Sequence, residues 1–140
     1  MSWENPKERK ITVKKILIVD DDTDITVLIE NRLKKEGYEV IIANDGNTGI
    51  KKALQEKPDL IIMDVMMPRM SGGEAVKTLK KYDNTRYIPI LFFTAMVSST
   101  ESNDGLEEIN VDGEFYPALT KPFEPSKLLS SIKLLLEKPP

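Results

Sequence analysis

Several apolar stretches of this sequence end in polar side chains that could carry out chemistry. The residues at these ends are Asp20, Asp21, Asp22, Asp64, Thr94 and Lys121. Clustered carboxylates raise one another's pKa values unless a cation neutralises them, and Mg²⁺ suits one or two carboxylates together with phosphate oxygens. Asp64 could act as a nucleophile that forms an aspartyl-phosphate. The metal, Lys121 and the Thr94 hydroxyl could then stabilise charge on the transferred phosphoryl group.

Asp64 is the most informative of these residues. It follows the run Leu60-Ile61-Ile62-Met63, which lies between Pro58 and Pro68 and is typical of a buried strand. A buried carboxylate is costly unless it is paired, bound to a metal or placed at an exposed edge. The carboxyl end of a strand is the edge at which open α/β sheets bind ligands.

Each feature also has a purely structural interpretation. Acidic residues after a strand often cap the next helix, and Asp22 or Thr23 could do only that. A single threonine after a strand is usually structural, and Lys-Pro before a helix is more often a solvated turn. Because separate strand ends would have to supply compatible chemistry by chance, we favour the functional interpretation.

The elements that must position these side chains alternate along the chain. The expected strands are Ile16–Val19, Tyr38–Ile42, Leu60–Met63, Ile88–Phe93 and Phe115–Thr120. The expected helices contain Ile25 to Leu33, Ile50 to Leu54, Glu74 to Lys81 and the segment after Pro125. This alternation predicts a parallel sheet with helices on both faces. Right-handed crossovers would bring the carboxyl ends of all the strands to one edge.

The segment 98–114 is the least regular part of the sequence. Its charged residues are all acidic, it contains glycines, and at most a weak helix around Leu106 and Ile109 fits. We favour a solvated loop here over a partner surface. In the strand that follows, Pro117 predicts an edge position, since proline cannot donate a ladder hydrogen bond.

Composition limits the class of protein. The 140 residues, of which 40% are hydrophobic and 31% charged, are typical of one soluble globular domain. A net charge of −3 argues against a general nucleic-acid-binding surface. No stretch approaches the ~20 apolar residues that span a membrane, and Met1 to Lys10 lacks the apolar core of a signal peptide. Without cysteine or histidine, the chain cannot use disulfides, thiolates or imidazoles. We therefore expect a cytoplasmic protein.

Four motifs together resemble those of the receiver domain of two-component response regulators. They are Ile16-Leu17-Ile18-Val19-Asp20-Asp21-Asp22, Asp64 with Met67-Pro68, Met70 and Gly72, Phe93-Thr94-Ala95, and Thr120-Lys121-Pro122-Phe123. The resemblance extends over residues 14–138, after a polar N-terminal extension of residues 1–13. It implies a single α/β domain with the flavodoxin-like (CheY-like) fold, a doubly wound sheet of five parallel strands in the order 2-1-3-4-5.

The resemblance also implies how phosphorylation would occur. Asp64 is expected to accept a phosphoryl group from a phosphohistidine on a sensor histidine kinase or phosphotransfer protein. Asp20 and Asp21 would form the acidic pair of the Mg²⁺ site. Asp21 and Asp64 would be direct ligands of the ion, as would the backbone carbonyl of Met66.

The remaining residues of the motifs would contact the phosphoryl group and respond to its presence. Thr94 would contact the phosphoryl group and shift inward, Lys121 would pair with a phosphoryl oxygen, and Ala95 would leave room beside them. The resulting population shift between two conformers would change the binding of a downstream protein target. We expect no turnover of an external substrate, no direct DNA binding, no membrane contact, and a monomer or phosphorylation-dependent dimer.

The output half of the sequence departs from the family pattern. Receivers commonly carry Tyr or Phe three positions before the lysine of Lys-Pro, where this chain has Ala118. Tyr116 or Phe115 could replace that aromatic only if the strand shifts its register or bulges. Met66 and Met96 occupy two positions that tune dephosphorylation in the family. Since a thioether cannot position an attacking water as an amide or carboxylate can, we expect slow hydrolysis.

Two other classes of protein remain open. A haloacid-dehalogenase-type phosphatase would place its nucleophile at Asp20, but Asp24 takes the last position of its Asp-x-Asp-x-Thr/Val motif and no acidic pair follows Lys121. A pseudo-receiver would bind partners without being phosphorylated, and the intact site residues argue against it. Because no DNA-binding helix-turn-helix, enzyme domain or linker follows Lys138, we expect a stand-alone receiver or a fragment of a longer regulator.

Overall fold

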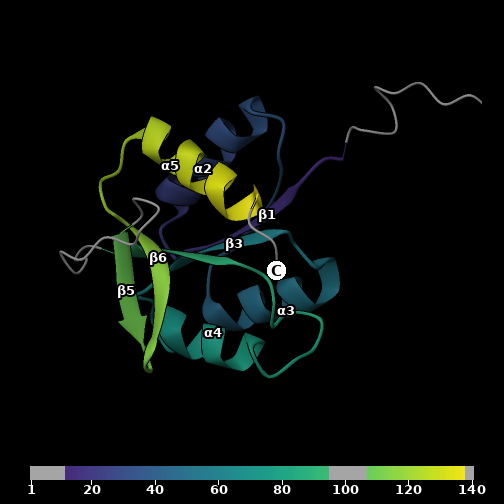
Figure 1. Cartoon of the computed structure of the whole chain (residues 1–140), viewed down its shortest axis with the longest axis vertical. Coiled ribbons are helices and arrows are strands. Elements are labelled where there is room, and N and C mark those ends of the chain that lie inside the picture. The colour runs from purple at the N-terminus through teal and green to yellow at the C-terminus, as the bar shows by residue number, and fades with distance from the viewer. Residues whose placement is uncertain (1–11, 95–106, 138–140) are drawn as a thin grey trace, which may run out of the picture.

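A mixed six-stranded sheet with helices on both faces forms the molecule (Figure 1). The structure, a computed structural model, describes residues 12–94 and 107–137. Its elements are β1 (Lys15–Val19), α2 (Thr23–Lys35), β2 (Glu39–Ala43), α3 (Gly46–Glu56), β3 (Leu60–Asp64), α4 (Gly72–Leu79), β4 (Ile90–Thr94), β5 (Glu107–Val111), β6 (Glu114–Thr120) and α5 (Pro125–Glu137). Among the described residues, no helix has the length and apolarity required to cross a membrane.

The parallel part of the sheet has the order that the family resemblance implies. The strands run β2-β1-β3-β4-β6-β5, and every neighbouring pair is parallel except β5 and β6. With β6 counted as the fifth parallel strand, the order is 2-1-3-4-5. The flavodoxin-like fold is therefore confirmed, with one antiparallel strand, β5, added at the edge.

β5 lies where the sequence predicts at most a weak helix around Leu106 and Ile109. Leu106 is outside the described residues, and the helix is wrong at Ile109, which pairs with Tyr116 of β6. The expected edge position of Pro117 is also wrong, because β6 lies between β4 and β5. The pairing of β6 with β4 begins at Ala118, so the proline precedes that ladder and does not interrupt it.

A tight turn joins β5 to β6. Val111 pairs with Glu114, which leaves Asp112 and Gly113 as a two-residue loop with φ values of 52° and 87°. Two positive φ values are those of a type I′ turn, whose twist matches the twist of antiparallel strands. The Gly113 N–H donates to Asn110 Oδ1 at 3.0 Å. The Asp-Gly dipeptide therefore explains why this acidic segment forms a hairpin.

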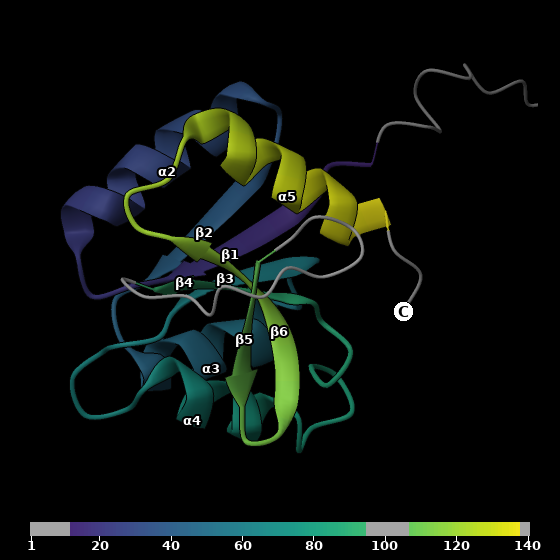
Figure 2. The same ribbon diagram turned by 60° about the vertical axis from the view of Figure 1, so that its left-hand side comes forward.

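Alternate side chains of the strands pack into two apolar layers. In β1, Ile16 and Ile18 pack with α2 and α5, whereas Leu17 and Val19 pack with α3 and α4. Figure 2 shows these helix pairs on opposite faces of the sheet. Because both faces are covered, β1 and β3 are apolar at nearly every position, as is usual for buried parallel strands.

Side-chain caps fix where two helices begin beside the carboxyl edge of the sheet. Asp22 caps α2, because its Oδ1 accepts the N–H groups of Asp24 at 3.0 Å and Ile25 at 3.3 Å. Ser71 and Glu74 form a reciprocal capping box at the start of α4. For Asp22, the structural interpretation therefore holds.

Candidate functional site

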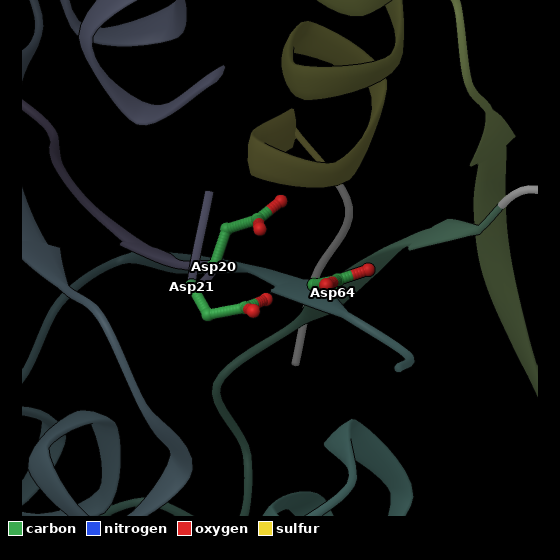
Figure 3. A group of neighbouring side chains, drawn as sticks. All are labelled: Asp20, Asp21 and Asp64. Carbon is green, nitrogen blue, oxygen red and sulfur yellow. The ribbon is translucent and has the colours of Figure 1, made fainter. Parts of the chain in front are cut away.

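Three carboxylates meet at the carboxyl ends of β1 and β3 (Figure 3). Asp20, Asp21 and Asp64 each offer a carboxylate oxygen, and these oxygens lie within 4.8 Å of one another. The topology causes this proximity, because Val19 of β1 pairs with Met63 of the adjacent parallel β3. Asp20 and Asp64 are buried and Asp21 is exposed. Asp21 is therefore the member of the group that solvent reaches most easily.

Lys121 reaches the same point from the turn between β6 and α5. Its ammonium donates to Asp20 Oδ2 at 3.0 Å and to Asp64 Oδ1 at 3.2 Å. Its backbone N–H donates to the Thr94 carbonyl at 2.9 Å, which ties the turn to the end of β4. The ammonium of Lys121 thus pairs with two of the three carboxylates.

Thr94 ends β4, the strand that lies between β3 and β6. Asp64 pairs with Phe93, and Val65 N–H donates to the Phe93 carbonyl at 2.9 Å. On the other side, Thr94 pairs with Thr120. The Thr94 side chain is buried. Its position at the end of the neighbouring strand is the one that the sequence predicts.

The ionisation of Asp64 reflects its opposing neighbours. Burial, and then the negative charge of Asp20, raise the pKa of Asp64 to about 6, although Lys121 and the Met66 N–H act in the opposite direction. Burial alone would lower the pKa of Lys121. The hydrogen bonds and charges of Asp20 and Asp64 outweigh it, so the pKa of Lys121 is raised. A second cation at the carboxylates would favour the ionised form of Asp64.

Hydrogen bonds from neighbouring segments hold Asp20 in place, and its own N–H donates to the Ala43 carbonyl at 3.1 Å. The side-chain amide of Asn44 donates to the Asp20 carbonyl at 3.1 Å, and the Asp22 N–H donates to Asp20 Oδ1 at 2.9 Å. Asn44 is not among the site residues predicted from the sequence. Its signal was its position directly after the second strand, which neighbours β1.

The loop after β3 explains one glycine of the motif. A Cβ atom at Gly72 would overlap the Asp64 carbonyl oxygen, and the Gly72 N–H donates to the Val65 carbonyl at 2.9 Å. Met66, in the same loop, has a side chain that is 76% exposed and so does not fill apolar space. The two other positions named from the sequence, Ala95 and Met96, lie outside the described residues.

An apolar groove opens beside the carboxylates. It lies between α2 and the β6–α5 turn, with a volume of about 540 Å³. Lys121 lines both the groove and the site, and Leu28 on α2 is 67% exposed. Arg32 and Lys35 add positive charge to the same surface. Lys121 therefore connects the groove to the carboxylates.

Comparisons with known proteins agree on one family. The family model described as "response regulator receiver domain" matches residues 16–133. The alkaline phosphatase synthesis transcriptional regulatory protein PhoP of Bacillus subtilis (strain 168) is 40% identical over 125 residues, which are 89% of this chain and 49% of that protein. The chain therefore spans about half the length of this curated relative.

Solved structures share the fold. The chemotaxis protein CheY4 of Vibrio cholerae is 33% identical, with a TM-score of 0.76, and the match covers 89% of this chain and 99% of that one. The receiver domain of the sensor histidine kinase PA1611 of Pseudomonas aeruginosa PAO1 has a magnesium ion coordinated in its active site cleft. It has a TM-score of 0.76 and covers 91% of this chain and 100% of that one. At 24% identity, this second likeness concerns the fold.

Proposed function

The chain belongs to the response regulator receiver domain family, and from that premise we propose that Asp64 accepts a phosphoryl group in a Mg²⁺-dependent reaction. The donor is a phosphohistidine on a sensor histidine kinase or phosphotransfer protein. The observation that carries the proposal is the position of Asp64, a buried carboxylate within ion-pair distance of Lys121 and next to two further carboxylates. Phosphorylation shifts the protein between two conformers with different affinity for a downstream target.

In the proposed step, a carboxylate oxygen of Asp64 attacks the phosphorus atom of the phosphohistidine. A P–O bond forms as the P–N bond breaks, and the electron pair of that bond remains on the imidazole nitrogen, which is protonated as it leaves. With a pKa of about 6, Asp64 is ionised at neutral pH and can act as the nucleophile. Lys121, 3.2 Å from Asp64 Oδ1, is close enough to bind an oxygen of the transferred group.

The acidic residues would hold the metal. Receiver domains bind Mg²⁺ at an acidic pocket, and the carboxylate oxygens of Asp20, Asp21 and Asp64 lie close enough together to share one ion. Exposed Asp21 leaves room for the waters that Mg²⁺ retains, and the Met66 carbonyl would be a further ligand. When bound, the ion neutralises charge on the transferred phosphoryl group.

Thr94 and the groove have separate parts in the proposal. Thr94 ends the strand beside Asp64 and would contact the phosphoryl group through its hydroxyl. The phosphodonor protein would pack against the groove of α2, because Lys121 forms a wall of both the groove and the site. Exposed Leu28 offers the apolar area that such a contact requires.

A mass measurement tests the proposal against its alternatives. We expect wild-type protein incubated with Mg²⁺ and acetyl phosphate to gain the mass of one phosphoryl group, stable in acid and labile in base. Asp64→Asn should gain none, whereas Asp22→Asn, a matched change at a helix cap, should behave as wild type. A phosphatase would instead turn over substrate through Asp20, and a pseudo-receiver would gain no mass.

A further inference from the structure

At the position where receivers commonly carry a switch aromatic, this protein has a small, buried residue. Ala118 stands there, completely buried, and β6 pairs with β4 in regular register from Ala118 to Thr120. The strand neither slips nor bulges, so no neighbouring aromatic moves into this position. A methyl group has no rotamers to exchange, and the residue therefore cannot act as a rotameric switch.

The two nearby aromatic side chains have other surroundings. Tyr116 packs edge-on against Phe92, with ring centroids 5.5 Å apart, and its hydroxyl donates to Glu114 Oε2 at 2.9 Å. The Lys80 ammonium lies 5.8 Å from the centre of the Tyr116 ring. Phe115 is 63% exposed. Tyr116 is thus held on the α4 side of the sheet, and Phe115 lies in solvent.

Glu107 of β5 stands directly opposite Ala118 in the hairpin. Its Oε2 accepts the Thr120 hydroxyl at 3.2 Å, and its Oε1 accepts the Lys127 ammonium at 2.9 Å. The Glu107 side chain is 22% exposed, so these bonds are partly shielded from water. One carboxylate therefore joins β5, β6 and the first turns of α5.

This bridge is one peptide bond from the site. Thr120 directly precedes Lys121, whose ammonium binds both Asp20 and Asp64. The Lys121 N–H also donates to the end of β4. A displacement of Lys121 that reaches its backbone would move the Thr120 peptide, and with it the hydroxyl that Glu107 holds.

We propose that Glu107 couples the state of Asp64 to the β5–β6 hairpin and α5, in place of an aromatic switch. The inference rests on the proposed phosphorylation of Asp64 and adds the route by which that event leaves the site. A phosphoryl group draws the Lys121 ammonium away from Asp20. The Thr120 hydroxyl then moves off Glu107, the Glu107–Lys127 ion pair weakens, and the edge strand loosens. Because coupling is reciprocal, loss of the bridge also favours the phosphorylated conformer.

Hydrogen exchange read by mass spectrometry, before and after treatment with acetyl phosphate and Mg²⁺, tests the route. In wild type, we expect phosphorylation to speed exchange of amides in 107–120 and in the first turns of α5 by about fivefold, at the low end of allosteric couplings. Glu107→Ala should exchange rapidly there in both states. Lys127→Met, which leaves the hairpin side chains intact, should show the same loss of response in α5.

Glu108→Ala is the matched control, because Glu108 lies on the same strand opposite Pro117 and should respond as wild type does. A phosphorylation response that persists in both Glu107→Ala and Lys127→Met would overturn the inference. So would wild-type protein that gains phosphoryl mass without any change in the hairpin. Wild-type protein that gains no phosphoryl mass would overturn the proposed function as well, so the two failures are distinguishable.

Discussion

At the scale of single residues, the site contains a carboxylate, Asp64, whose ionised form is disfavoured by its surroundings. Burial and Asp20 raise the pKa of Asp64 to about 6, even with Lys121 in contact. The ionised form of Asp64 therefore lowers the stability of the folded protein, and the proposed function gives this carboxylate the role of nucleophile. Metal binding and phosphoryl transfer are both reactions that such a group favours.

Asp64→Asn should stabilise the metal-free protein at pH 7.5 and lose most of this advantage near pH 4. The folded-state pKa of about 6 lies above the unfolded value of about 3.9, so wild-type stability falls as pH rises between these values. The full shift corresponds to at most about 3 kcal/mol. Urea unfolding of wild type and Asp64→Asn between pH 4 and pH 7.5 measures the difference in their unfolding free energies. A difference in unfolding free energy that is independent of pH would contradict the assignment.

Asp21→Asn should weaken Mg²⁺ binding by about tenfold or more, since a charged contact is worth about 1.5–3 kcal/mol. Asp21 is the exposed member of the group, so its removal leaves the buried ion pairs of Lys121 in place. Calorimetric titration with Mg²⁺ gives the affinity. Asp22→Asn removes the same charge one residue later and retains a good helix cap. Equal losses in the two variants would exclude a specific role for Asp21.

Met66→Asn, alone or with Met96→Glu, should accelerate loss of the phosphoryl group by about tenfold. An amide can position an attacking water whereas a thioether cannot. Because the Met66 side chain is 76% exposed, the change should not disturb packing. The decay of the phosphorylated mass with time, after removal of acetyl phosphate, gives the rate. Unchanged decay would show that these methionines do not limit hydrolysis.

At the scale of elements, one glycine allows the start of α4 to lie close against the end of β3. Gly72→Ala should cost about 1–3 kcal/mol of unfolding free energy, because the added Cβ overlaps the Asp64 carbonyl oxygen in packed surroundings. Gly73→Ala is the matched control in the same helical turn. Its Cβ would meet a Val111 methyl at 3.1 Å, which can move more easily than backbone. Denaturant unfolding compares the two, and equal costs would contradict the account of Gly72.

The arrangement of the elements could be predicted only in part from the sequence. Asp20, Asp64, Thr94 and Lys121 were assignable to one edge because parallel strands leave no other place for residues at their carboxyl ends. β5 was not predicted, since its acidic residues suggested solvation. The Asp112-Gly113 dipeptide between alternating residues was the available signal of a hairpin.

The bridge of Glu107 could not be read from sequence either. It depends on the register of β5 against β6 and on the approach of α5, and both are set by packing between segments distant in the chain. Likewise, the position of Asn44 after the second strand did not by itself show that its amide supports the Asp20 carbonyl. Local patterns therefore predicted which side chains gather at the candidate site, whereas the contacts that support them came from tertiary structure.

At the scale of the whole molecule, the parallel sheet gathers the site at one edge and the hairpin extends one side of that sheet (Figures 1 and 2). The groove of α2 lies against the site through Lys121, and the hairpin is linked to it through Thr120 and Glu107. Input and output surfaces would thus meet at the two consecutive residues Thr120 and Lys121. This arrangement makes Asp64 the centre of the proposed function.

The most direct test is to identify the residue that carries the phosphoryl group. Borohydride reduces an aspartyl-phosphate to homoserine, so protein treated with acetyl phosphate and Mg²⁺ and then reduced can be sequenced by tandem mass spectrometry. We expect homoserine at position 64 alone, and none when Mg²⁺ is omitted. Homoserine at position 20 or 21, or at no position in protein that binds Mg²⁺, would contradict the proposal that Asp64 is the phosphoacceptor.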